Sequence, residues 1–224
     1  MYDKAMDEPK PAPHELTRWI EGAFLEELEA HRAGLADLVR TRLVERRPAV
    51  AHLVQNDLDA MNVAYTLLAV AGFDVLEPIE GEAGALRVVE AALHGPARSK
   101  VREGARAMLD GAADPFSALV AASKEREAGY FGDSFDFRRP IDDDHGYVLE
   151  IHRCLYHQVL VACGRVELMP TLCRTDTAWI DAIEPARHRL RFVRPSTFAT
   201  ASTCRMWFMR TDGDDPNAGV EVDI

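Results

Sequence analysis

The sequence predicts an α+β fold, in which an N-terminal helical half packs on a small, mainly antiparallel sheet with short helices. In residues 14–129 the apolar side chains recur at the spacing of amphipathic helices. From Tyr130 onward they occur in short segments that alternate with polar residues, which is typical of strands. A hydrophobic content of 47% in 224 residues is enough for one sizeable core without disulfides or metal staples.

We expect three regions along the chain. Residues 1–13 are predicted to form a disordered arm, because they contain charges and prolines but few apolar residues. Residues 14–210 are predicted to form a single domain, with a helical half at 14–129 and a half at 130–210 that carries all four cysteines. Residues 211–224 contain five acids and no base, and are expected to be a solvated tail.

The helical half is predicted to consist of several separate helices. Gly72 is expected to cap the third of them, and residues 73–79 to form an extended link. The Gly95-Pro96 pair is expected to separate two later helices. The expected helices are 15–31, 35–46, 49–71, 84–94, 97–109 and one that starts at Asp114-Pro115 and fades near residue 129.

The second half is predicted to alternate strands with short helices. The acidic turn 142–144 should join the first two strands, and Gly164 should end a short helix over 153–162. Residues 167–182 are expected to be helical in parts. The expected strands are 134–138, 146–152, 189–194 and 203–209, with the last two paired.

The charge and the cysteine usage narrow the function class. The formal net charge is −11, so the protein should repel nucleic-acid phosphates. No run of 18 apolar residues is present, which predicts no membrane span. The chain opens on a polar, proline-bearing segment without the pattern of a signal peptide, so we expect a cytoplasmic protein with reduced thiols. The broad apolar face of residues 15–31 is compatible with a homodimer.

Common cofactor and catalytic motifs are absent from the sequence. It contains no glycine-rich phosphate loop, no His-Glu-x-x-His, no Cys-x-x-Cys and no Gly-x-Ser-x-Gly. We therefore predict no cofactor and no metal, and a small molecule as the substrate.

The first candidate site is Cys173-Arg174-Thr175-Asp176. Positions three apart share one face of a helix, so the thiol of Cys173 and the carboxylate of Asp176 should be neighbours. A carboxylate beside a nucleophilic sulfur can donate or accept a proton. The alternative is a buried cysteine next to an aspartate that caps the following segment.

Two further cysteines are candidates. On the strand 203–209, Cys204 should point inward, either as a core residue or into a pocket. The pattern His152-x-Cys154-x-x-His157 allows a Cys/His pair or part of a metal site, or simply a strand-to-helix junction with a capping histidine. Cys163 lies out of phase with Cys154 on a helix and is interpreted as structural.

Arg194 is a candidate for binding an anionic group. It shares the apolar face of the strand 189–194 with Leu190 and Phe192, and a guanidinium in that position needs a partner. The partner is Asp176 or Asp181, or else a substrate carboxylate bound by two hydrogen bonds. The alternative is an arginine at the strand end that reaches the solvent.

Together these segments resemble the L-2-amino-thiazoline-4-carboxylic acid hydrolase family. The resemblance covers residues 146–210, and its motifs are Arg153-Cys154, Gly164, Leu172-Cys173-x-x-Asp176, an arginine-and-threonine segment over 191–197, and Cys204 followed by alternating aromatics. In the helical half, Asn62-x-x-Tyr65-x-Leu67 is similar to the family's helical segment. One departure is Ala201-Ser202-Thr203, which stands where the family usually has a glycine-rich pair.

The resemblance implies that water opens a five-membered aminothiazoline ring to give an N-carbamoyl cysteine. Cys173 would be the nucleophile or would position the water, and Asp176 would move the proton. The resemblance places Cys204 and Cys154 at the site as well. It implies substrate-binding roles for four residues, namely Arg194, which would hold the carboxylate, Thr197, and His152 and His157, either of which could act as a base.

Other functions fit the same residues. Cys154, Cys173 and Cys204 with Asp176 or a histidine would form a soft ligand set for zinc. The order Cys173, Asp176, Cys204 is similar to the catalytic set of organomercurial lyases. A non-catalytic protein that binds a small molecule is the third alternative.

Overall fold

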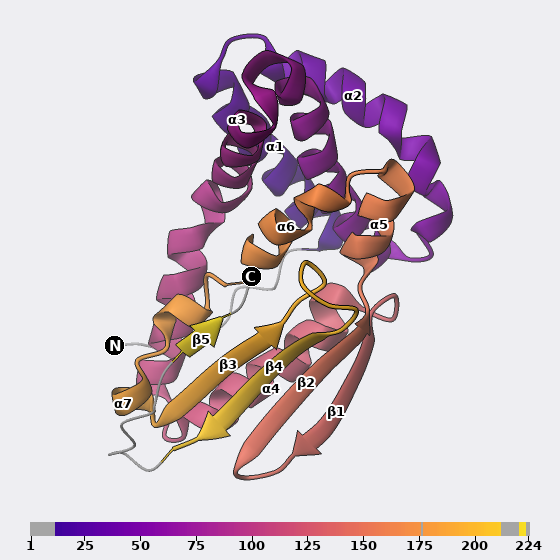
Figure 1. The fold of residues 1–224 in the computed structure, drawn as a ribbon. Helices are drawn as coiled ribbons and strands as arrows, with labels where there is room; N and C mark the ends of the chain where they lie inside the picture. Colours follow the sequence, from indigo (N-terminus) through magenta and orange to yellow (C-terminus); the bar gives the residue numbers. More distant parts are fainter. Residues whose placement is uncertain (1–11, 176, 212–219, 223–224) are drawn as a thin grey trace.

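The computed structural model describes residues 12–175, 177–211 and 220–222, and it confirms the α+β fold. The elements follow one another as α1 (Pro13–His31), α2 (Leu35–Val50), η1 (Ala51–Leu53), α3 (Asp57–Gly111), α4 (Pro115–Arg126), η2 (Glu127–Phe131), β1 (Asp136–Asp142), β2 (Gly146–Arg153), α5 (Leu155–Cys163), η3 (Val166–Leu168), α6 (Met169–Thr175), η4 (Ile180–Ala182), α7 (Pro185–His188), β3 (Leu190–Ser196), β4 (Cys204–Arg210) and β5 (Val220–Val222). Figure 1 shows a helical layer, which contains α1, α2, α5 and α6, above the sheet.

The sheet has the strand order β1-β2-β4-β3-β5. The first three pairs are antiparallel, and β5 runs parallel to β3. The two middle pairings place Phe208 opposite Tyr147 on one side and Phe192 on the other, so aromatic side chains form a row across one face. Strand β5 lies within the stretch that the sequence predicted to be a solvated tail, and it was not expected.

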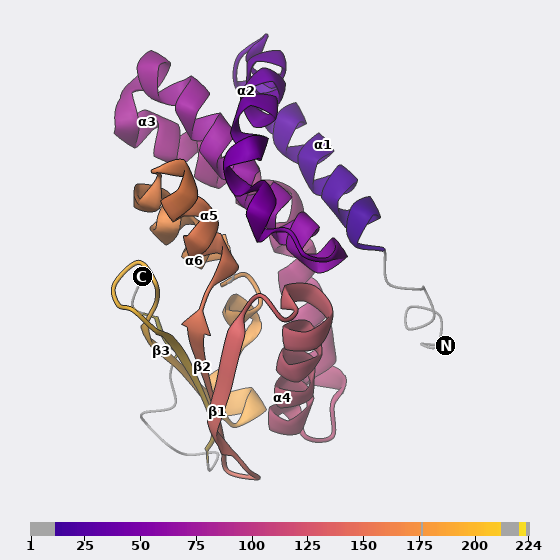
Figure 2. The ribbon, with the colours of Figure 1, turned by 90° about the vertical axis from the view of Figure 1, so that its right-hand side faces the viewer.

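One face of the sheet is buried and the other is more open. On β4, Cys204, Met206 and Phe208 are buried, while Arg205 and Trp207 point to the exposed face, as the alternation predicted. Seen from the side, α4 lies along one face of the sheet (Figure 2). This arrangement is usual for an antiparallel sheet that packs helices on one side only.

Element α3 consists of two helical segments that meet at a kink at Gly81, and both extend beyond the helices that the sequence predicted. Neither the extended link at 73–79 nor the break at Gly95-Pro96 is present, because the helix continues through both. Leu76 is fully buried, and its packing favours a helix over an exposed link. At Gly81 the backbone leaves the helical conformation, with φ of 73° and ψ of 167°, and this kink divides α3 into two helical segments.

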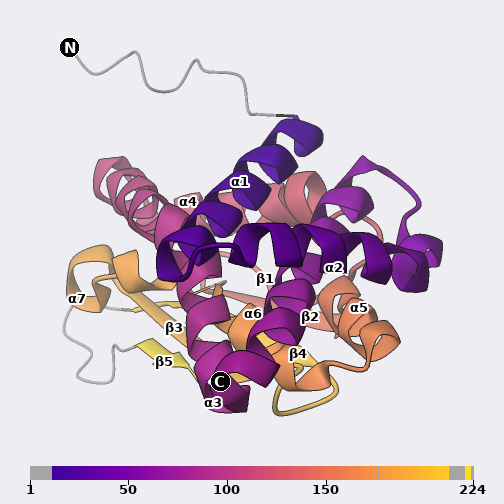
Figure 3. The same cartoon turned by 90° about the horizontal axis from the view of Figure 1, so that it is seen from above.

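Gly72 is not a helix cap. It lies inside α3, where an added Cβ would be 2.8 Å from Cζ of Phe24 and 3.3 Å from Cγ2 of Val89. Phe24 belongs to α1, so the missing side chain lets α1 approach α3 closely. Seen from above, α1, α2 and α3 cover the sheet layer (Figure 3).

Helix α3 also contains a window apolar enough to cross a membrane by length and composition, but most of that window is buried inside the protein. A core helix of a folded protein has the same property. Two predicted helix boundaries are confirmed, namely the start of α4 after Asp114 and the end of α5 before Gly164. Asp114 accepts a hydrogen bond from the Ser117 amide at the start of α4, and Gly164 takes a left-handed conformation after α5.

Candidate active site

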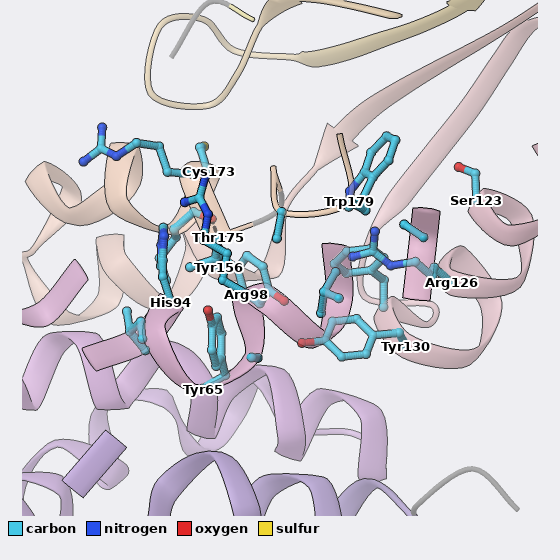
Figure 4. A pocket seen from close by; sticks show the side chains of 18 of the residues that line it. Tyr65, His94, Arg98, Ser123, Arg126, Tyr130, Tyr156, Cys173, Thr175 and Trp179 are labelled. Atoms are coloured by element: carbon cyan, nitrogen blue, oxygen red, sulfur yellow. Dashed lines mark hydrogen bonds between the residues drawn. The ribbon is translucent and has the colours of Figure 1, made fainter. Parts of the chain in front are cut away.

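A cavity of about 610 Å³ lies between the helical layer and the buried face of the sheet. Its walls come from both halves of the chain, including α1, α3, α4, α6 and the inward side chains of β2 and β4. A cavity of this size and position is a normal site for a small molecule. Figure 4 shows the side chains that project into it.

Three of the four cysteines line this cavity. Cys154 immediately precedes α5, Cys173 lies in α6 and Cys204 begins β4, and all three side chains are buried and are not part of a disulfide. The fold thus brings together three thiols that are far apart in the sequence. Cys163, at the end of α5, is buried elsewhere, beside Arg46 and Asp74.

The surroundings of Cys154 favour its neutral form. Burial, together with a smaller contribution from the neighbouring Cys173 and Cys204, raises the pKa of this thiol to about 12. The backbone amides of His157 and Tyr156, at the start of α5, act in the opposite direction. Cys154 is therefore a thiol rather than a thiolate near neutral pH, which makes it a poor nucleophile.

Arg194 links two of the cysteines. Its side chain is buried, and its Nη1 donates to the carbonyl oxygen of Cys173 at 2.9 Å. Its Nη2 lies 3.6 Å from Sγ of Cys204. The guanidinium therefore holds α6 against β4 and brings a positive charge to the Cys204 sulfur.

Of the two carboxylates predicted as partners of Arg194, only Asp181 can be judged, and it has a different partner. Asp181 forms an ion pair of 2.6 Å with Arg98 instead. Asp176 lies outside the residues that the structure describes. It directly follows α6, whose last residue is Thr175.

The two predicted histidines do not line the cavity. His152 lies on the face of β2 opposite to the buried Ile151, and its Nε2 is 2.9 Å from Oε2 of Glu150. The ring of His157 packs against Phe198, with centroids 5.3 Å apart. Neither residue is among those that surround the cavity.

Thr197 is buried but also lies outside the cavity wall. Its Oγ1 accepts a hydrogen bond from the Ala199 amide at 3.1 Å, and its carbonyl oxygen accepts one from the Ala201 amide at 2.8 Å. Thr197 therefore shapes the loop that leads to Cys204, a contact that a motif alone does not reveal.

His94 is a cavity residue that the sequence did not indicate. It lies in the part of α3 next to the predicted helix break, and its Nε2 is 3.4 Å from the carbonyl oxygen of Thr171. Burial lowers its pKa below the ordinary value of 6.5, so the ring is neutral at physiological pH. Figure 4 shows His94, Arg98, Thr175 and Cys173 at the same end of the cavity.

Glu127 was also missed. It is a buried carboxylate in the cavity wall, and it accepts hydrogen bonds from the Tyr147 hydroxyl and from Arg139. Burial and this contact raise the pKa of Tyr147. Glu127 begins η2, a single π-helical turn, and such turns are frequent at functional sites. In the sequence, the only indication of a role for Glu127 was a charged residue close to the predicted end of a helix.

Aromatic side chains from one short segment form a further part of the cavity wall. We call Tyr130, Phe131, Phe135 and Phe137 the aromatic wall. Phe131 is 4.9 Å from Phe135 between ring centroids, and Phe135 stacks on Phe137 at 5.8 Å.

Tyr156 joins the aromatic wall to the cysteines. Its ring lies 5.4 Å from that of Phe135, and it is two residues after Cys154. Its hydroxyl donates to Oδ1 of Asn62 at 2.8 Å, and Nδ2 of Asn62 donates to the carbonyl oxygen of Tyr130 at 2.9 Å. The buried Asn62 thus fixes this corner of the cavity from α3.

The alternative of a zinc site is not supported by a set of ligands in the part of the chain that the structure describes. No three histidine, cysteine, aspartate or glutamate side chains are arranged there to hold a metal ion.

Comparison with known families gives one match. A family model described as L-2-amino-thiazoline-4-carboxylic acid hydrolase matches residues 61–208, which is well over half of the chain. The match covers all the cysteines and extends into α3, where it includes the segment Asn62-x-x-Tyr65-x-Leu67 noted in the sequence. No curated protein and no solved structure gives a significant match.

Proposed function

This chain belongs to the L-2-amino-thiazoline-4-carboxylic acid hydrolase family, and on that premise we propose that it opens a cyclic, sulfur-containing amidine acid with water. The family name implies a hydrolase. The observation that supports a thiol-based reaction is the meeting of Cys154, Cys173 and Cys204 in one cavity, with Arg194 in contact with two of them.

The proposed reaction begins with the thiolate of Cys173. The thiolate adds to C2 of the ring, the bond between C2 and the ring sulfur breaks, and that sulfur takes a proton from Asp176. Water then attacks the same carbon and returns one proton to Asp176. The bond to Cys173 breaks, the second proton moves to nitrogen, and the product is an N-carbamoyl cysteine with a free thiol.

The other residues of the site are assigned by their surroundings. Cys154, which stays protonated, would donate a hydrogen bond rather than attack. The guanidinium of Arg194 lies beside Sγ of Cys204 and favours the thiolate form of that cysteine. Arg194 and Arg98 supply positive charge for the substrate carboxylate.

The test is release of thiol from L-2-amino-thiazoline-4-carboxylate, followed with a thiol reagent and by mass spectrometry of the product. Cys173→Ser is expected to abolish turnover, and Asp176→Asn to lower kcat by roughly 10²–10⁴-fold. Cys163→Ser is the matched control, since this buried cysteine lies outside the cavity wall, and it should retain activity.

Two results would contradict the proposal. Activity in Cys173→Ser equal to that in Cys163→Ser would remove Cys173 as the nucleophile. A folded wild-type protein that releases no thiol from this substrate would remove the substrate assignment.

A further inference from the structure

The cavity is much larger than the ring that defines the family. L-2-Amino-thiazoline-4-carboxylate has about nine non-hydrogen atoms, and even at the ~30 Å³ that each water takes in the liquid these would occupy less than half of the space. The cavity measures about 610 Å³. A second chemical group is therefore needed to fill it.

The remaining space is bounded largely by apolar surface, although Ser123, Arg126 and Glu127 also line the cavity. The aromatic wall lines it on one side, and Ala122 of α4 adds a small apolar residue. Figure 4 places Tyr130 and Arg126 at the end of the cavity away from Cys173 and His94. An apolar group that displaces water from the face of the aromatic wall gains free energy from the apolar area that it buries there.

The aromatic wall is continuous with the thiols. The ring of Tyr156 contacts that of Phe135, and Tyr156 lies in the first turn of α5, two residues after Cys154. Arg126 packs its guanidinium over the rings of Tyr130 and Phe131, at 5.9 and 5.5 Å from their centroids, which fixes those rings at the edge of the wall. One molecule can therefore contact the cysteines and the aromatic wall at once.

From this we infer that the substrate of the proposed reaction carries an aryl or bulky alkyl substituent that occupies the aromatic wall, so that the unsubstituted ring is a minimal fragment of it. The inference rests on the proposed function for the reacting end of the molecule. The aromatic wall itself is defined by the contacts of the cavity alone.

The test compares three compounds that differ only at the exocyclic nitrogen of the aminothiazoline carboxylate, which bears hydrogen, methyl or benzyl. All three release the same kind of thiol on ring opening, so a single assay gives kcat/KM for each. Burial of one methylene contributes about fourfold in affinity, and the benzyl compound is expected to exceed the parent by at least about tenfold.

Two variants test whether the aromatic wall causes the higher kcat/KM that is expected for the benzyl compound. Ala122→Phe fills the space beside that wall and should remove the advantage of the benzyl compound while the parent compound reacts as before. Ala121→Phe is the matched control, because the neighbouring Ala121 is exposed and lies outside the cavity. It should behave like the wild type.

The outcomes separate this inference from the proposed function. Equal kcat/KM values for parent and benzyl compounds in the wild type would overturn the inference, as would an equal loss for both compounds in Ala122→Phe. If no compound releases thiol, the proposed function fails and binding is measured instead by the fluorescence of Trp179 in the cavity. Benzyl binding that is weakened in Ala122→Phe would then support the aromatic wall, and no binding would overturn it.

Discussion

Arg194 shows how a single residue organises the site. A buried guanidinium is costly unless its hydrogen bonds are made. Here its contacts include the carbonyl oxygen of Cys173 and the sulfur of Cys204. The strand pattern predicted that Arg194 needs a partner, but it gave no sign of the contacts with Cys173 and Cys204. The predicted pairing with Asp176 stays a prediction, because that residue lies outside the described part of the chain.

The contact with Cys204 leads to a prediction about thiol reactivity. Removing the positive charge in Arg194→Gln should slow alkylation of Cys204 at pH 7 by roughly tenfold, because the thiolate loses its stabilising neighbour. Arg194→Lys keeps a charge there and should retain part of the rate. The rates are measured by mass spectrometry after limiting iodoacetamide.

Cys163 serves as the internal standard in the same sample. Its thiol is remote from Arg194, so its labelling rate should not change if the variant is folded. A Cys204 rate that is the same in wild type and Arg194→Gln would show that the guanidinium has no electrostatic effect on this sulfur.

The sequence predicted the residues that carry reactive groups better than it predicted which of them meet. Cys173, Cys204, Cys154 and Arg194 all line the cavity. His94 and Glu127 were missed because each is a lone ionisable residue in a helical segment, where spacing gives no hint of what lies opposite. Only the packing of α3 and η2 against the sheet places them in the cavity.

At the scale of elements, α3 is where local signals and tertiary packing disagree. Gly72, Gly95 and Pro96 all favour a break in an isolated peptide. In the protein all three residues lie within helical segments of α3, whose apolar residues pack mainly against α1, α2 and α5. Short antiparallel strands and the caps of α4 and α5 depend on local pattern, and these were predicted well.

The close approach at Gly72 predicts an unusual mutational effect. Alanine normally stabilises a helix relative to glycine by up to about 1 kcal/mol. At Gly72 the new methyl group would meet Phe24, which is buried and has little room to move, so Gly72→Ala should lower the free energy of unfolding by about 1–2 kcal/mol.

Gly22 in α1 provides the comparison for this experiment. A Cβ at Gly22 meets nothing within 4 Å, so Gly22→Ala should be neutral or stabilising. Both variants are measured by urea unfolding. A stabilising effect at Gly72 would show that α1 and α3 are not held at the spacing described.

At the scale of the whole molecule, one buried carboxylate joins three helical segments. Asp74 of α3 pairs with Arg46 of α2 at 2.6 Å and with Arg165, just after α5, at 2.7 Å. The side chain of Asp74 is 3% exposed, while the two arginines are 27% and 22% exposed. These ion pairs connect the N-terminal helices to the half that carries the cysteines.

Asp74→Asn should therefore destabilise the protein by about 2–3 kcal/mol, because Arg46 loses this carboxylate partner and Arg165 keeps only its pairs with Glu77 and Glu167. Asp37→Asn is a matched control at the exposed pair with Arg40, and its effect should be within about 0.5 kcal/mol. Thermal and urea unfolding would measure both, and equal effects of the two variants would contradict this account.

The position of the cavity between two layers has a consequence for how the family can diversify. The cysteines and Arg194 belong to the C-terminal half, whereas α1 and α3 contribute the opposite wall. Substitutions in these two helices can reshape the space around a substrate while the reacting groups keep their supports. Variation in α1, in particular, leaves unchanged the segments that carry the three thiols and Arg194.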